Sequence, residues 1–242
     1  MTKSGQVKLR HIVPSMVTVF AICAGMTAVR MSLDGRIETA LYFILLAVFL
    51  DAADGKLARF LDTASPFGAE LDTLADFFNF GIVPGMLLYN TLYIGTEFDN
   101  LGFLATLVLA VCCALRLARF NLSLRSDAVT LKQSDYFTGV PAPALACLAL
   151  MPIFMHLNGW ETTDLPVLRA IYIIGVGFLA VSTLPTYSIK HASISRAYLP
   201  YAIIAAMVLV VCLMVYPWAT LITVNILYLG SLPLSYRAAS KA

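Results

Sequence analysis

The chain has 242 residues, of which 60% are hydrophobic and only 12% are charged. A composition this apolar excludes an ordinary soluble domain and indicates a protein that crosses a membrane several times. The formal net charge of +2 says little, because in membranes the placement of Lys and Arg matters more than their sum. The five cysteines lie in apolar segments without metal-ligand spacing, so we interpret them as packing residues.

Eight apolar segments follow one another along the chain and predict eight transmembrane helices. The expected spans are about 12–31, 37–60, 66–93, 101–120, 139–157, 167–184, 198–215 and 218–234. Pro66 suits the start of the third span, because proline fits the first turn of a helix. Only Tyr216 and Pro217 separate the last two spans, which predicts a tight hairpin. The expected fold is an all-α, polytopic membrane helical bundle.

Basic residues are distributed unevenly between the two sides of this bundle. With both termini in the cytoplasm, thirteen of the sixteen Lys and Arg residues fall on the cytoplasmic side, as the positive-inside rule requires. Only Arg30, Arg36 and Arg169 fall on the other side. We therefore expect a multi-pass protein of the cell inner (cytoplasmic) membrane.

Four aspartates lie in the adjoining ends of the second and third spans, where ionisable side chains are costly and suggest a functional site. Asp51 and Asp54 are three positions apart, and Asp72 and Asp76 are four apart, so each pair shares a helix face. One cluster of four carboxylates is expected. Their mutual repulsion favours divalent cations, and an all-oxygen ligand set favours Mg²⁺, Mn²⁺ or Ca²⁺ over Zn²⁺. Two such ions would form a clamp of the kind used on phosphoryl groups.

Small residues and an arginine accompany the carboxylates. Gly55 and Ala58 follow the first aspartate pair by one turn, and Gly68 precedes the second pair by one turn, so a substrate could approach the backbone. Arg59 adds a permanent charge with donors suited to phosphate. Two alternatives are helix-end charges that reach towards the interface and a metal-ion transporter, whose carboxylates should lie near the midplane of the membrane. The cluster is predicted to open to the cytoplasm.

The spacing D-x2-D-G-x2-A-R-x8-G-x3-D-x3-D resembles the signature of the CDP-alcohol phosphotransferases. The eight fixed positions are Asp51, Asp54, Gly55, Ala58, Arg59, Gly68, Asp72 and Asp76. The resemblance implies a six-helix catalytic membrane domain at 1–190, a C-terminal transmembrane hairpin at 191–242 packed on it, and a homodimer. It also implies two Mg²⁺ or Mn²⁺ ions as the only cofactor, and no nucleic-acid partner is expected.

The same resemblance implies roles for single residues. All four aspartates would be metal ligands, and Asp76 would also accept the proton of the attacking hydroxyl as the catalytic base. The implied substrate is CDP-diacylglycerol, whose phosphatidyl group passes to an alcohol while CMP leaves. Its predicted binding residues are Asp51, Gly55, Ala58, Arg59, Ser65 and Gly68.

Four further stretches resemble the membrane-embedded phosphatidylserine synthases within this family and imply L-serine as the acceptor. They are SPFGAELD at 65–72, RLARFN at 116–121, FTGVPAP at 137–143 and LPTYS at 184–188. A carboxylate on the acceptor would favour nearby Arg or Lys. The predicted acceptor-binding residues are Arg116, Arg119, Asn121, Thr138 and Lys190.

Alternatives to these acceptor assignments stay open at this point. Either arginine could grip the lipid diphosphate instead, or serve only to anchor the cytoplasmic end of its span. The acceptor could be glycerol 3-phosphate, an inositol phosphate or choline. One residue departs from the family pattern: Ser15 stands where the Pro-Asn-x-x-Thr opening usually has asparagine, while Pro14 and Thr18 match it.

Overall fold

The computed structural model describes residues 13–61, 65–126, 136–160, 165–182, 185–187 and 199–239. The elements up to residue 126 are α1 (Val13–Leu33), α2 (Ile37–Phe60), α3 (Pro66–Phe77), the π-helix η2 (Phe78–Ile82), α4 (Val83–Leu92) and α5 (Asp99–Ser126). The later elements are β1 (Tyr136–Thr138), α6 (Ala142–Ala149), α7 (Met151–Leu157), α8 (Pro166–Val181), β2 (Pro185–Tyr187), α9 (Leu199–Val215) and α10 (Pro217–Ala239).

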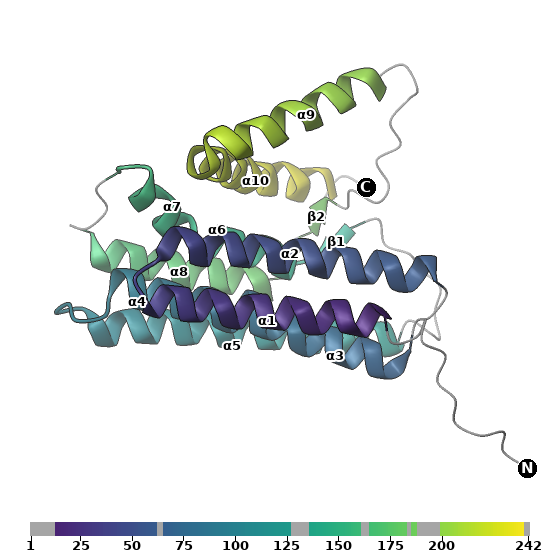
Figure 1. The fold of residues 1–242 in the computed structure, drawn as a ribbon, viewed down its shortest axis with the longest axis horizontal. Coiled ribbons are helices and arrows are strands. Elements are labelled where there is room, and N and C mark those ends of the chain that lie inside the picture. The colour runs from purple at the N-terminus through teal and green to yellow at the C-terminus, as the bar shows by residue number, and fades with distance from the viewer. Residues whose placement is uncertain are drawn as a thin grey trace, which may run out of the picture.

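The helices form a polytopic bundle, as the sequence predicted. Because α3, η2 and α4 follow one another without a gap, and α7 follows α6 after Leu150, the described residues contain the eight expected helical segments. Helices α1 to α6 and α8 lie together, while α9 and α10 lie along one side of them (Figure 1). Helix α10 packs against α7 and β2, and α9 packs against α10.

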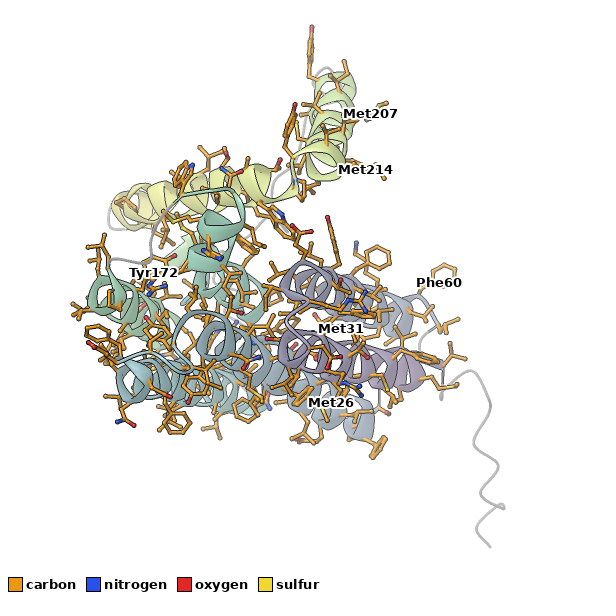
Figure 2. All side chains as sticks on the ribbon, turned by 60° about the vertical axis from the view of Figure 1, so that its left-hand side comes forward. Met26, Met31, Phe60, Tyr172, Met207 and Met214 are labelled. Atoms are coloured by element: carbon orange, nitrogen blue, oxygen red, sulfur yellow. The ribbon has the colours of Figure 1, made fainter. Side chains whose placement is uncertain are left out.

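The outer surface of the bundle is apolar. Among the described residues, three helical stretches are long and apolar enough to cross a membrane: Val13–Leu33, Pro66–Leu92 and Asp99–Ser123. Helix α9 is shorter but strongly apolar, and its Met207 and Met214 are 64% and 82% exposed (Figure 2). Exposed side chains of this kind suit lipid contact, as expected for a helical membrane protein.

Small residues let α1 and α2 pack closely. The two helices are in extensive contact, and their buried residues include Ala21, Ala24 and Ala28 on α1 and Ala40 and Ala47 on α2. Small side chains allow two helix backbones to approach each other, which is how many membrane helices associate. The close pairing brings the first turns of α1 beside the last turns of α2.

The predicted fifth span is broken between α6 and α7. Pro152 has no N–H to donate to the carbonyl of Leu148, and its ring crowds that carbonyl. The Tyr172 hydroxyl of α8 donates to the Leu148 carbonyl at 2.8 Å instead. The amide of Asn225 in α10 donates to the neighbouring Cys147 carbonyl, also at 2.8 Å. Carbonyls at the break thus become docking points for two other helices.

The third span contains the π-helical turn η2, which the sequence analysis did not anticipate. Val83 N–H donates to the carbonyl of Phe78, five residues earlier, and Pro84 has no N–H to continue the α-helical pattern. Asn79 in this turn is 2% exposed and faces α1 so closely that a Cβ on Gly25 would lie 2.1 Å from its Oδ1. The turn therefore fits the third span against α1 just after Asp76.

Two short strands form a second unpredicted feature. β1 pairs with β2 in antiparallel register, with Tyr136 opposite Tyr187 and Thr138 opposite Pro185. The pair joins the chain after α5 to the chain after α8, and β2 lies against α10. Apart from these strands, the described secondary structure is helical.

Candidate active site

The four aspartates come together where α2 and α3 face each other. Carboxylate oxygens of Asp51, Asp54 and Asp72 lie within 4.8 Å of one another. Asp76, one turn beyond Asp72, is hydrogen-bonded to Asp51 through its side chain. Carboxylates held this closely repel one another unless cations or protons neutralise them, and a cluster of oxygen donors suits Mg²⁺ or Mn²⁺. The residues present therefore fit a divalent metal site.

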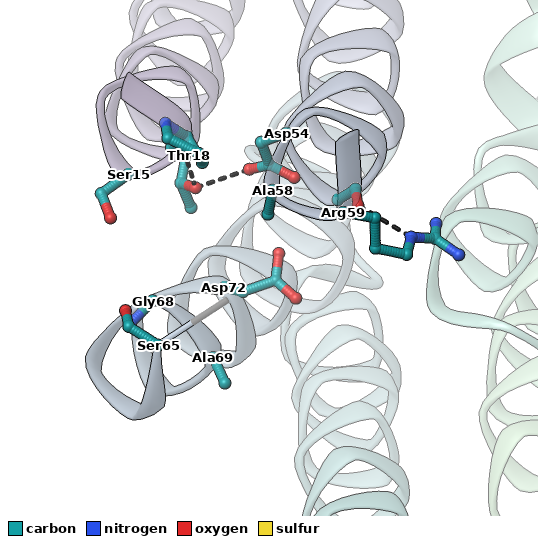
Figure 3. Close-up of a pocket in the computed structure, with 11 residues that line it drawn as sticks. Ser15, Thr18, Asp54, Ala58, Arg59, Ser65, Gly68, Ala69 and Asp72 are labelled. Carbon is teal, nitrogen blue, oxygen red and sulfur yellow. Dashed lines mark hydrogen bonds between the residues drawn. The ribbon is translucent and has the colours of Figure 1, made fainter. Parts of the chain in front are cut away.

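A pocket of about 210 Å³ opens beside this cluster between α1, α2 and α3 (Figure 3). Its lining residues are Pro14, Ser15, Thr18, Asp54, Gly55, Ala58, Arg59, Ser65, Gly68, Ala69 and Asp72. The set combines two aspartates with small residues and hydroxyl groups. Most of the residues predicted to bind CDP-diacylglycerol line this pocket.

Thr18 of α1 supports the metal-ligand candidate Asp54. Its Oγ1 donates to Asp54 Oδ2 at 2.5 Å, and both side chains are 4% exposed. A hydrogen bond to the second oxygen of a ligating carboxylate fixes its orientation and tunes its affinity for metal. The sequence analysis noted Thr18 only as part of the Pro-x-x-x-Thr match and did not predict this role. Ser15, the departure from the family pattern, also lines the pocket.

The start of α3 is fixed by a cap next to the pocket. Ser65 is the N-cap residue of α3, and its Oγ accepts a hydrogen bond from Gly68 N–H at 3.0 Å. A Cβ on Gly68 would lie 3.1 Å from that oxygen, so glycine keeps the cap undisturbed. By contrast, a Cβ on Gly55 would have no heavy atom within 4 Å. The missing side chain of Gly55 therefore leaves open space on the pocket side of α2.

Arg59 lies at the end of α2 with part of its guanidinium engaged. Its Nε donates to the Gly55 carbonyl one turn earlier at 2.9 Å. The terminal nitrogens point away from Asp72 (Figure 3). Arg59 nevertheless lines the pocket, so a change of its rotamer would bring the terminal nitrogens to a phosphate at the rim.

Arg116 of α5 lies close enough to Asp76 to interact with it electrostatically. Its Nε is buried and has no hydrogen-bond partner among the described residues. A buried guanidinium nitrogen without a hydrogen-bond partner is unusual and favours a ligand in the functional state. The structure thus brings one of the predicted acceptor-binding residues to the candidate base.

Arg119 and Asn121 have contacts of a different kind. Arg119 donates through Nη1 to the Val181 carbonyl at 2.7 Å and through Nη2 to the Ser182 carbonyl at 3.1 Å, at the end of α8. Asn121 Nδ2 donates to Thr73 Oγ1 of α3 at 3.1 Å. Asn121 thus ties the C-terminal part of α5 to α3, which carries two of the aspartates, and Arg119 ties it to the end of α8.

The remaining predicted acceptor residues lie farther along the chain. Thr138 is the last residue of β1, where it pairs with Pro185 of β2. Lys190 follows β2 and lies outside the described residues. The strand pair thus brings the predicted Thr138 segment close to the segment that precedes Lys190.

Comparison with known proteins identifies the family. A family model described as CDP-alcohol phosphatidyltransferase matches residues 11–179, which include every residue of the pocket. The chain belongs to the CDP-alcohol phosphatidyltransferase family. A second model, described as CDP-alcohol phosphatidyltransferase 2, matches residues 198–233 of this phosphatidyltransferase, in α9 and α10.

Relatives of this phosphatidyltransferase come from bacteria and an archaeon. A protein of Mycobacterium leprae (strain TN) is 31% identical over 226 residues, which cover 92% of this chain and 74% of the relative. A protein of Bacillus subtilis (strain 168) is 34% identical over 186 residues, or 76% of this chain and 94% of the relative. A Methanocaldococcus jannaschii protein is 32% identical over 176 residues, or 72% of this chain and 74% of the relative. All three are named CDP-diacylglycerol–serine O-phosphatidyltransferase. The phosphatidyltransferase described here is accordingly a transferase of phospholipid biosynthesis.

Proposed function

We propose that this enzyme transfers the phosphatidyl group of CDP-diacylglycerol to the hydroxyl of L-serine, giving phosphatidylserine and CMP. The observation that carries the proposal is the position of Asp76, which is hydrogen-bonded to Asp51 and interacts electrostatically with Arg116, whose Nε is buried. A proton acceptor beside a cation suits an acceptor molecule with both a hydroxyl and an anionic group. The names of the relatives support serine as that molecule.

The aspartates would bind metal ions, and the pocket would bind the lipid substrate. Asp51, Asp54, Asp72 and Asp76 would hold two Mg²⁺ or Mn²⁺ ions, which when bound supply positive charge to the diphosphate. The pocket beside Gly55 and Ala58 would receive the cytidine end of the lipid, with Ser65 and Gly68 shaping the opposite wall. Arg59 would contact a phosphate oxygen at the rim.

Bond making and breaking follow from this placement. The serine oxygen forms a bond to the lipid-side phosphorus, and the bond from that phosphorus to the oxygen of CMP breaks, so CMP leaves with the electron pair. Asp76 would take the proton of the serine hydroxyl, because it is the aspartate that interacts with Arg116, the residue proposed to bind the acceptor. Thr18 keeps the Asp54 carboxylate oriented throughout.

The predicted acceptor-binding residues would contribute in two ways. Arg116, with an unpaired buried Nε, would bind the serine carboxylate directly. Arg119 and Asn121 would position the surrounding elements through the carbonyls and the hydroxyl that they already contact. We propose Thr138 and Lys190 as further residues of the acceptor pocket.

The wider organisation is also part of the proposal. Residues 1–190 would form the catalytic domain and residues 191–242 a hairpin packed on it, in a homodimer of the cell inner membrane. The uneven distribution of basic residues supports cytoplasmic termini and a cytoplasmic active site.

The acceptor is tested with purified enzyme, CDP-diacylglycerol and Mn²⁺, and a panel of alcohols. The panel contains L-serine, ethanolamine, glycerol 3-phosphate, an inositol phosphate and choline, with CMP and the lipid product measured for each. We expect rapid CMP release and phosphatidylserine with L-serine alone. Equal or faster transfer to another alcohol would overturn serine as the acceptor but not the family.

A further inference from the structure

A second buried polar group without a partner lies near Arg116, and it comes from the C-terminal hairpin. The hydroxyl of Tyr228 in α10 is buried and, like Arg116 Nε, has no hydrogen-bond partner in the described parts of the chain. The two side chains interact electrostatically with each other. Buried polar groups are nearly always hydrogen-bonded in folded proteins, so two neighbouring exceptions indicate a missing ligand.

The position of α10 is fixed by contacts one and three turns before Tyr228. Asn225, which is 2% exposed, donates to the Cys147 carbonyl at the break between α6 and α7. Near the start of α10, the Trp218 ring stacks on Phe154 with 6.0 Å between the ring centroids. Since residues three apart share a helix face, Tyr228 faces inward as Asn225 does. Its hydroxyl is therefore held near Arg116 by the packing of the hairpin.

Asp76, Arg116 and Tyr228 offer hydrogen-bonding groups that complement those of a hydroxy acid. Asp76 interacts with Arg116, and Arg116 interacts with Tyr228, so the guanidinium has a carboxylate from α3 and a phenol from α10 as neighbours. Arg116 Nε–H and Tyr228 O–H are both hydrogen-bond donors, whereas the Asp76 carboxylate accepts. A small molecule with a carboxylate at one end and a hydroxyl at the other satisfies both donors and presents its hydroxyl to Asp76.

We propose that Tyr228 is a specificity-determining residue of the acceptor pocket, where its hydroxyl and Arg116 Nε together bind the carboxylate of the amino-acid acceptor. This inference rests on the proposed function and adds a residue from outside the 11–179 family match. The C-terminal hairpin is then part of the acceptor site as well as a membrane anchor.

The test uses the whole enzyme and a substitution that removes one oxygen atom. Tyr228→Phe keeps the ring and its packing but removes the hydroxyl, so KM for L-serine should rise roughly ten- to a hundredfold, as for loss of a hydrogen bond to a charged group. KM for CDP-diacylglycerol and any slow transfer to ethanolamine, which has no carboxylate, should stay within about twofold of the parent. Tyr216→Phe, in the turn of the same hairpin where the side chain is 68% exposed, is the matched control and should behave as the parent.

A second measurement does not depend on turnover. Binding of L-serine to the Mn²⁺-loaded parent should raise its thermal unfolding temperature, and the same serine concentration should raise that of Tyr228→Phe much less. An unchanged KM for serine together with an undiminished thermal shift would overturn the role of Tyr228 and leave the proposed function intact. If the parent itself prefers another alcohol to L-serine, the proposed function fails first.

Discussion

The four aspartates of the site have different neighbours. Asp51 and Asp54 belong to α2, Asp72 lies within 4.8 Å of both across the helix contact, and Asp76 alone among the four also interacts with Arg116. We therefore expect these identical side chains to have different roles, which depend on their positions. The roles can be separated by substitutions that change charge and proton acceptance but hardly change shape.

Asp76→Asn should lower kcat at least about a hundredfold, because an amide can occupy the site but cannot accept the hydroxyl proton. Binding of CDP-diacylglycerol, measured by ligand-induced thermal stabilisation, should change far less. Glu97→Gln, an exposed carboxylate in the loop between α4 and α5, is the control. Near-normal kcat in Asp76→Asn, with the rate defect found in Asp72→Asn instead, would contradict the assignment of the base.

Thr18→Val should weaken the affinity for Mn²⁺ about tenfold or more, since it removes the hydroxyl that donates to Asp54 and keeps the side-chain volume. Thr27→Val provides the control, because Thr27 lies on the same helix and its hydroxyl donates to the backbone carbonyl of Cys23. The measurement is the Mn²⁺ concentration for half-maximal activity. Equal shifts in the two variants would assign the effect to α1 as a whole.

Arg116→Ala and Arg119→Ala should fail in different ways. Removing Arg116 should reduce kcat/KM for L-serine about ten- to a hundredfold and barely change a residual ethanolamine reaction. Removing Arg119 should reduce both reactions, since its two contacts hold the end of α8. A serine-selective loss in Arg119→Ala alone would reverse the two roles.

At the scale of elements, the long helices could be predicted from sequence and their irregularities could not. Continuous apolar runs bounded by polar residues predicted α2 from residue 37 to residue 60, as observed. At the break after α6, Tyr172 and Asn225 donate hydrogen bonds to the Leu148 and Cys147 carbonyls, and these two donors lie on distant helices. The β1–β2 pair likewise joins segments almost fifty residues apart, each only three residues long.

The candidate site likewise has features that could be predicted from the sequence and features that could not. The aspartate cluster could be predicted because its members share helix faces at fixed spacing, and the two helices adjoin in sequence. The hydrogen bond from Thr18, the carbonyl contacts of Arg119 and the approach of Tyr228 could not, because each joins residues more than 30 positions apart. The Pro-x-x-x-Thr match was the one sequence signal that pointed to Thr18.

The junction between α8 and β1 depends on a glycine. Gly139 has φ +81°, and a Cβ there would lie 2.8 Å from the Ala180 carbonyl oxygen and 2.9 Å from that of Ser182. Gly139→Ala should therefore lower the free energy of unfolding by about 1–3 kcal/mol more than backbone strain alone. Gly95→Ala is the control, because Gly95 has φ +73° with no heavy atom within 4 Å of the added Cβ. Equal thermal unfolding of both variants would show that the junction adapts.

At the scale of the whole molecule, the two ends of the bundle differ in their polar residues. At the end away from the aspartates, polar contacts join the helices: the Tyr89 hydroxyl donates to Asp99, and the Tyr93 hydroxyl donates to the Pro166 carbonyl at 3.1 Å. The Arg169 guanidinium lies 5.2 Å from the centre of the Tyr93 ring. These contacts join α4, α5 and α8 at the end of the bundle opposite the carboxylate cluster.

The most direct test of the central claim counts metal ions and turnover in the same sample. Purified enzyme with CDP-diacylglycerol is titrated with Mn²⁺ while free Mn²⁺ is followed by electron paramagnetic resonance and CMP release is measured with L-serine. We predict two Mn²⁺ ions per chain, weaker binding in Asp51→Asn and Asp54→Asn, and no CMP release in excess chelator. Full CMP release in excess chelator, or unchanged Mn²⁺ binding in both variants, would contradict a metal-assisted transfer at these aspartates.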